Sequence, residues 1–190
     1  MDILAGIIFV LIIVGGIVVI STYNSIIACA NGAQRAWADV LGYERQKTRT
    51  LEGLSEQADS FKEHEQQLLL ELTSLRESVA QLPSTPNGDA LKPVESASQK
   101  IFDRVKLAVE AYPDLGSSAV VAGLMKEIAE QQANVGAAIS VFNGEVERFN
   151  NSIQFFIGAQ INNMLLHHQR IIPFSDSQAS SSFEYQPNFS

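Results

Sequence analysis

The histidines of this chain are the residues from which catalytic or metal chemistry would have to be built. His64-Glu65 begins a string that resembles the zinc-protease motif H-E-x-x-H, but Leu68 stands where the second imidazole is required. His167 and His168 are adjacent, so on a helix they would point about 100° apart and would not face one ion. No Ser or Cys nucleophile stands beside a usable histidine, and no glycine-rich phosphate loop is present. We therefore predict a non-catalytic protein without a metal or cofactor.

Asn143 and Asn150 form the polar pair with the most informative spacing. They stand seven residues apart, which places them on one face of a helix among aromatic and aliphatic residues. An asparagine at a helical seam fixes the register, because only one alignment supplies its hydrogen-bond partner. Asn24 is a candidate for that distant partner. The alternative is that the two amides line a binding site for a small molecule.

The element that leads into this helical body is an apolar run from Ile3 to Ile20, which carries no charge. At a rise of about 1.5 Å per residue it is about 27 Å long, enough to cross the hydrocarbon core of a bilayer. No second such run follows, so we predict one membrane anchor at residues 1–22 and a body that works at a membrane surface.

A cleaved signal is the alternative to an anchor, because Ala28-Cys29-Ala30 resembles a cleavage site and Ile26-Ile27-Ala28-Cys29 a lipoprotein box. A secretory signal needs a positive segment before its apolar run, and only Met1 and Asp2 precede this one. The run is also longer than the usual apolar region of about 7 to 15 residues. The uncleaved anchor is therefore favoured.

The charges set the expected orientation and partners. No Lys or Arg precedes the apolar run, and Arg35 is the first that follows it, which favours a cytoplasmic body. The single Cys29 cannot form an intramolecular disulfide, in keeping with a reducing compartment. The formal net charge is −8, and no basic stripe with interleaved aromatics is visible. Nucleic acid is therefore not an expected partner, whereas the bilayer is, through residues 3–20.

Beyond the anchor, the apolar residues predict long helices. One stripe steps by four and three residues from Tyr23 to Leu82, the period of a bundle or coiled-coil seam. Trp37 lies on this stripe and is expected in the core, with an acceptor for its indole N–H. Gly42 and Gly53 are the places where the helix would bend. Three charged residues interrupt the stripe: Glu44, Lys47 and Glu65.

Prolines separate the remaining helices. Residues 83–89 read as a loop, and a helix from Val94 to Ala111 is expected to end at Tyr112-Pro113, because the residue before proline is pushed out of the helical region. A last helix is predicted to run to about Leu166, which would bring Met164 to Arg170 back to the headgroups if the helices alternate in direction.

The predicted organisation is thus an anchor at 1–22, a helical bundle at 23–172 and a Ser-rich tail at 173–190. This organisation contains several short motifs: Tyr23-Asn24, Ala36-Trp37-Ala38-Asp39-Val40, His64-Glu65, Leu75-Arg76, Ala111-Tyr112-Pro113-Asp114-Leu115, Phe142-Asn143 and Phe149-Asn150. With them the chain resembles the LemA family of bacterial membrane proteins, over roughly Leu4 to Phe189. The chain departs from that family where Phe142 and Phe149 replace tyrosines and Phe155-Phe156 replaces Phe-Pro.

The resemblance implies an all-α fold in which an N-terminal transmembrane helix continues into an antiparallel bundle of about four long helices. It also implies a single-pass protein of the bacterial inner membrane. The expected function is that of a non-catalytic scaffold or interaction protein that self-associates or binds protein partners. The alternatives are an adaptor or regulator of a membrane-bound enzyme, and a ligand-binding sensor that uses the face of Asn143 and Asn150.

Overall fold

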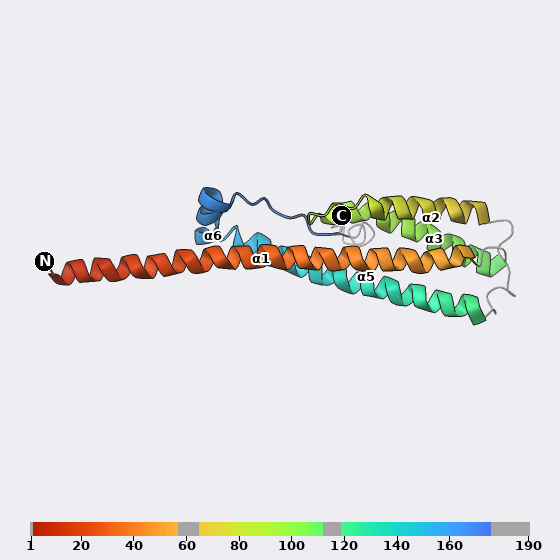
Figure 1. The fold of residues 1–190 in the computed structure, drawn as a ribbon, viewed down its shortest axis with the longest axis horizontal. Helices are drawn as coiled ribbons and strands as arrows, with labels where there is room; N and C mark the ends of the chain where they lie inside the picture. The colour runs from red at the N-terminus through yellow and green to blue at the C-terminus, as the bar shows by residue number, and fades with distance from the viewer. Residues whose placement is uncertain (1, 57–64, 112–118, 176–190) are drawn as a thin grey trace, which may run out of the picture.

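The computed structural model describes residues 2–56, 65–111 and 119–175 of the 190-residue chain. Within these ranges every regular element is a helix. Successive long helices run alternately away from and back toward the N-terminal end, so the predicted all-α antiparallel bundle is confirmed (Figure 1). The four long helices are α1 (Asp2–Glu56), α2 (Glu65–Ala80), α3 (Lys92–Ala111) and α5 (Ala119–Ser152).

Helix α1 joins the apolar segment to the bundle without a break. It has 55 residues and is therefore about 82 Å long. Gly42 and Gly53 do not interrupt it, although each glycine costs about 1 kcal/mol relative to alanine in a helix. Residues 3–21 are exposed, and burial begins at Ile26 and continues along the predicted stripe. The expected continuity of the apolar segment with the bundle is confirmed.

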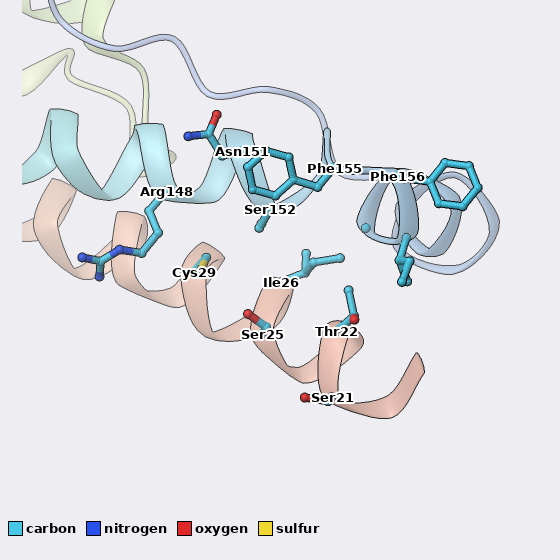
Figure 2. A pocket seen from close by; sticks show the side chains of 12 residues that line it. Ser21, Thr22, Ser25, Ile26, Cys29, Arg148, Asn151, Ser152, Phe155 and Phe156 are labelled. Atoms are coloured by element: carbon cyan, nitrogen blue, oxygen red, sulfur yellow. The ribbon is translucent and has the colours of Figure 1, made fainter. Parts of the chain in front are cut away.

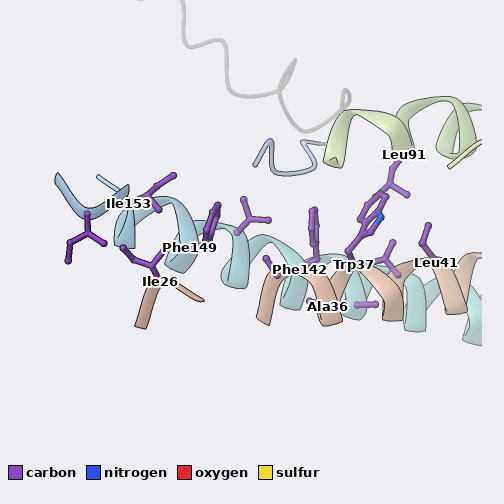
Figure 3. Packing of buried hydrophobic residues seen from close by; sticks show 13 residues of the cluster. Ile26, Ala36, Trp37, Leu41, Leu91, Phe142, Phe149 and Ile153 are labelled. Carbon is purple, nitrogen blue, oxygen red and sulfur yellow. The ribbon is translucent and has the colours of Figure 1, made fainter. Parts of the chain in front are cut away.

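The buried side chains form two separate clusters, which we call the proximal core and the distal core by their distance from the apolar segment. The proximal core lies between α1 and α5 and includes a Trp37–Phe142 ring pair with centroids 5.1 Å apart (Figure 3). The distal core joins α2 and α3 to the ends of α1 and α5 and is built from aliphatic residues. Its members are Leu51, Leu68, Leu72, Leu75, Val79, Val94, Ala97, Ile101, Val105 and Ile128.

The α2–α3 pair covers only the distal half of α1 (Figure 1). Helix α2 has 16 residues, whereas α5 has 34 and continues back along α1 toward the apolar segment. Two helices alone cannot enclose a core, so other parts of the chain cover the proximal half. These are the connection that follows α2, with its short helix η2 (Gly88–Leu91), and the extended segment that follows the last helix.

The prediction that the last helix runs unbroken to about Leu166 is wrong. Helix α5 ends at Ser152, and a new short helix α6 (Phe156–Ile161) leads into a π-helical turn η3 (Asn162–Leu166). Gly158 permits the turn, because a side chain there would clash with the carbonyl oxygen of Ser152. Residues 145–157 contain no glycine or proline, so Gly158, six residues after the end of α5, is the nearest such residue that follows the break.

Candidate functional site: asparagine clamps and a buried polar belt

The extended segment at residues 167–175, which we call the strap, begins where η3 ends. His167 takes a left-handed conformation, with φ 56° and ψ 28°, and its N–H donates to the carbonyl oxygen of Asn162. This residue stops the helix and turns the chain back toward the bundle (Figure 1). The strap then has to satisfy its own backbone polar groups without a helix or a sheet.

Asn150 and Asn143 satisfy them by pairing with the strap backbone. The Nδ2 of Asn150 donates to the carbonyl oxygen of Ile171 at 2.8 Å, and its Oδ1 accepts from the N–H of Ile171 at 2.9 Å. Asn143 makes the same two bonds to Phe174, both at 2.9 Å. Each side-chain amide therefore engages both polar groups of one strap residue through one of its N–H groups and its carbonyl oxygen.

The spacing of the two asparagines sets the register of the strap. Seven residues of α5 rise about 10.5 Å, and three extended residues, from Ile171 to Phe174, span about 10 Å. The two distances match, so both clamps form together and a slip of one residue would break both. The asparagines thus fix register, but against an extended backbone and not across a helical seam. Asn24 is exposed, and the hydrogen bonds go to the strap instead of to it.

Asn162 is a third clamp, and no sequence motif marks it. Its Nδ2 donates to the carbonyl oxygen of His168 and its Oδ1 accepts from the N–H of the same residue, both at 2.9 Å. The His168 ring also packs edge-on against Phe149, with centroids 5.7 Å apart. Asn162 lies outside the heptad spacing of the other two asparagines, because the break after α5 intervenes. Only its burial in the folded chain reveals its role.

Trp37 ties the connection after α2 to the proximal core. Its indole N–H donates to the carbonyl oxygen of Pro83 at 2.8 Å, so the predicted core position and the predicted acceptor are both present. Gln34 donates to the carbonyl oxygen of Ser84 at 2.8 Å. The N–H of Gly88 donates to the carbonyl oxygen of Ile172 at 2.8 Å, and the strap passes so close that a side chain at Gly88 would clash with it. The connection and the strap therefore close the proximal core together.

A buried polar belt separates the proximal core from the distal core. Glu44 and Lys47 occupy stripe positions, and both side chains are almost fully buried, with Lys47 Nζ 2.8 Å from Glu44 Oε2. Ser98 of α3 lines the same cavity as this pair, Gln131 of α5 is also buried, and neither Ser98 Oγ nor Gln131 Oε1 has a hydrogen-bond partner in the described structure. This cavity of about 230 Å³ adjoins the belt, and Phe174 of the strap lines one side of it. The lining of this cavity is mixed, since Leu91, Phe102 and Ile139 stand beside the polar residues, and its size suits ordered water.

The distal core is bordered by more exposed ion pairs. Arg104 of α3 donates to Glu71 of α2 from Nε at 2.9 Å and from Nη2 at 2.7 Å. The hydrogen bond from Glu71 raises the pKa of Arg104 above its usual value. Arg76, one of the family-motif residues, pairs with Glu52 of α1 at 2.8 Å. These pairs connect α2 to both of its neighbours.

The remaining family-motif residues do not gather into one place. Tyr23 and Asp39 are exposed on α1, and Glu65 is the first residue of α2. His64, Tyr112 and Pro113 lie outside the described residues. Among the residues that are described, no group of three or more His, Cys, Asp or Glu side chains is placed to hold a metal ion.

These features define a class of protein: a helical bundle closed by a clamped strap and continuous with one apolar helix. Among the described residues, α1 is the one helix long and apolar enough to cross a membrane, and its apolar stretch is not buried in the bundle. A model of the LemA family matches residues 36–182, from the proximal part of the bundle through the strap, so the chain belongs to the LemA family. The family expected from the sequence is confirmed. No curated protein matches the chain.

Proposed function

We propose that this chain is a membrane-anchored, non-catalytic scaffold or interaction protein of the LemA type. The observation that carries the proposal is the form of α1. Its exposed apolar stretch has the length of a bilayer span, and the same helix continues into both cores of the bundle. A rigid helical connection of this kind holds the bundle at a set distance and direction from the membrane.

The packing of α1 supports an anchor that is retained. Ile26 is fully buried in the proximal core, and Cys29 lies inside the helix and packs against that core. Cleavage beside Cys29 would remove Ile26 and expose part of the surface it covers. A cleaved signal is expected to contribute nothing to the mature core.

The charge distribution supports a cytoplasmic bundle at the inner face of a bacterial membrane. Residues 3–38 contain one charge, that of Arg35, and residues 148–175 contain Arg148 and Arg170 but no Asp or Glu. The negative charge of the chain therefore lies mostly farther from the apolar segment. Positive charge beside a span favours the cytoplasmic side.

A surface for protein partners is offered by the region between α1 and α5. Two hollows of about 440 and 320 Å³ lie there, and Asp39 and Val141 line both. Tyr43 lines the smaller one, and the side chains of Val141 and Tyr43 are exposed. The LemA family is not known as an enzyme family, which agrees with a role in binding. We propose that this surface binds a second copy of the chain or another membrane protein. In the second case the chain would be an adaptor.

The anchor is tested by extraction of membranes from cells that produce the full chain with a C-terminal tag. We expect the chain to stay in the membrane pellet in alkaline carbonate, and the tag to resist protease until the inner membrane is opened. A soluble chain that lacks residues 1–28 would show that the apolar segment is a cleaved signal. A tag digested from the periplasmic side would overturn the cytoplasmic orientation.

The interaction surface is tested by photo-crosslinking in intact cells, with a photoreactive residue at Val141 and a matched control at Lys126, which is exposed on the distal part of α5. Crosslinks that form at Val141 but not at Lys126 support the proposal. Products made of this chain alone identify a self-assembling scaffold, and one recurring foreign membrane protein identifies an adaptor. Equal or absent crosslinking at the two positions would contradict an interaction surface here.

A further inference from the structure

The elements that follow the break after α5 expose an unusual amount of apolar surface. We call residues 155–166 the foot. Phe155 and Phe156 are 68% and 83% exposed, and Met164 and Leu165 are 73% and 60% exposed. Large apolar side chains that cluster on a surface mark a contact with another molecule or with lipid.

The foot lies directly beside the end of the apolar segment. A groove of about 810 Å³ between them is lined by Ser21, Thr22 and Ser25 of α1 on one side and by Phe155 and Phe156 on the other (Figure 2). The segment ends at Ile20, so these α1 residues lie about 2 to 8 Å beyond it along the helix. In Figure 1, α6 is the part of the bundle nearest the N-terminal end of the chain.

The break after Ser152 turns the foot away from the direction of α5. An unbroken α5 would carry Phe155 and Phe156 straight along α1 toward the bilayer. Instead the chain turns at Phe155, which has extended backbone angles, and α6 restarts beside α1 with Gly158 packed against Ser152. Two short helical turns with an exposed apolar side suit the headgroup–acyl boundary, where such elements are buried by about 5–10 Å.

The charges around the foot suit the same location. From residue 148 to residue 175 the chain carries no acidic residue, and its two arginines are Arg148, which pairs with Glu145 at 2.9 Å, and Arg170, which is exposed and favours anionic headgroups. Tyr23 is exposed on α1 three residues after the segment ends. Tyrosine is enriched at this level of membrane proteins, because its ring is apolar and its hydroxyl is polar.

We propose that the foot is a second membrane contact, which inserts Phe155, Phe156, Met164 and Leu165 into the headgroup–acyl boundary of a phospholipid bilayer. The inference rests on the proposed function, since the bilayer it meets is the one that α1 spans. With α1 and the foot both in the membrane, the bundle is held at two points and cannot rotate freely about α1. The strap starts at the end of the foot. The hydrogen bonds by which Asn143 and Asn150 hold the strap in register therefore also fix the position of the foot.

The test places a spin label at single cysteines of the full chain in vesicles of phosphatidylcholine and phosphatidylglycerol. Cys29, the only cysteine, is first replaced by alanine. Phe156→Cys and Met164→Cys probe the two parts of the foot, Leu11→Cys probes the span and Lys126→Cys is the water-exposed control. The accessibility of each label to oxygen and to a water-soluble nickel chelate gives its depth.

We expect the Leu11 label to be deep, both foot labels to lie at the boundary and the Lys126 label to lie in water. A deep Leu11 label with both foot labels as accessible to nickel as Lys126 would overturn the foot while the anchor stands. A Leu11 label in water would overturn the anchor, and the foot with it. Phe156 and Met164 belong to different elements, and both side chains are exposed. Replacing either one with a labelled cysteine therefore leaves no cavity in a core.

Discussion

The proximal and distal cores are closed by different means, although α1 and α5 contribute to both. In the distal core, four helices supply aliphatic side chains that close the interior, and every backbone group in it belongs to a helix. The proximal core has two long helices, and a non-helical strap covers it. A non-helical cover exposes backbone N–H and C=O groups, which is why Asn143, Asn150 and Asn162 are needed there.

The buried polar belt divides these two modes of packing. A buried ion pair is weak support for stability, because the cost of removing two charges from water can exceed their attraction. Glu44 and Lys47 lie one turn apart on α1, so their pair is made within the helix and does not depend on how α1 packs against its neighbours. The pair neutralises two charges that the packing of α3 and α5 around α1 buries.

The largest expected effect is the loss of Trp37. Trp37→Ala should lower the free energy of unfolding by about 3–5 kcal/mol for the ring, and by about 1 kcal/mol more for the hydrogen bond to Pro83. The measurement is denaturant unfolding of the full chain in detergent. Leu51→Ala in the distal core, at about 2–5 kcal/mol, is the comparison. Hydrogen exchange at the Gly88 amide should accelerate in the Trp37 variant and not in the Leu51 variant; equal acceleration in both would contradict separate cores.

Lys47→Met should destabilise the chain by about 3–5 kcal/mol, because it leaves the Glu44 carboxylate buried and unpaired. The double variant Glu44→Leu with Lys47→Met removes both charges and should recover most or all of the lost stability. Both are compared by their midpoints of denaturant unfolding. A double variant as unstable as the single one would show that the pair itself contributes net stability.

Asn150→Leu should cost about 1–3 kcal/mol, because the N–H and C=O of Ile171 lose their partners. Faster hydrogen exchange at Ile171 and Phe174, with no change in α2 and α3, is the diagnostic result. Asn151→Leu is the matched control, since Asn151 is exposed next to it on the same helix. Unchanged or raised stability of Asn150→Leu with the same fold would remove the register role of this clamp.

The smallest effect is expected at the rim of the distal core. Arg104→Gln should cost only about 0.2–1 kcal/mol, because the pair with Glu71 is partly exposed and screened by salt. The loss should shrink further at high salt, and the unfolding midpoints at low and high salt measure it. A loss as large as that of Lys47→Met would show that the exposed rim matters as much as the buried belt.

Much of the fold was readable from the sequence because helical periodicity is local. From Ile26 onward the stripe marks the buried face of α1, and even Glu44 and Lys47 keep to its register. Their positions on the stripe predict that both side chains are buried, although both residues are charged. The spacing of Asn143 and Asn150 indicated that the pair fixes a register. It did not indicate that the segment held in register is an extended strap and not a second helix.

By itself, the sequence determined the apolar segment through an uncharged run, the family through short motifs, and the helical bundle through apolar residues that repeat every three to four positions. Only the tertiary structure decided the break after Ser152, the path of the strap and the partners of the three asparagines. The clamps of Asn150 and Asn143 join residues 21 and 31 positions apart, and their bonds go to backbone groups, which every residue carries. No side-chain pattern marks such a partner, so it appears only when packing leaves one side of the proximal core without a helix.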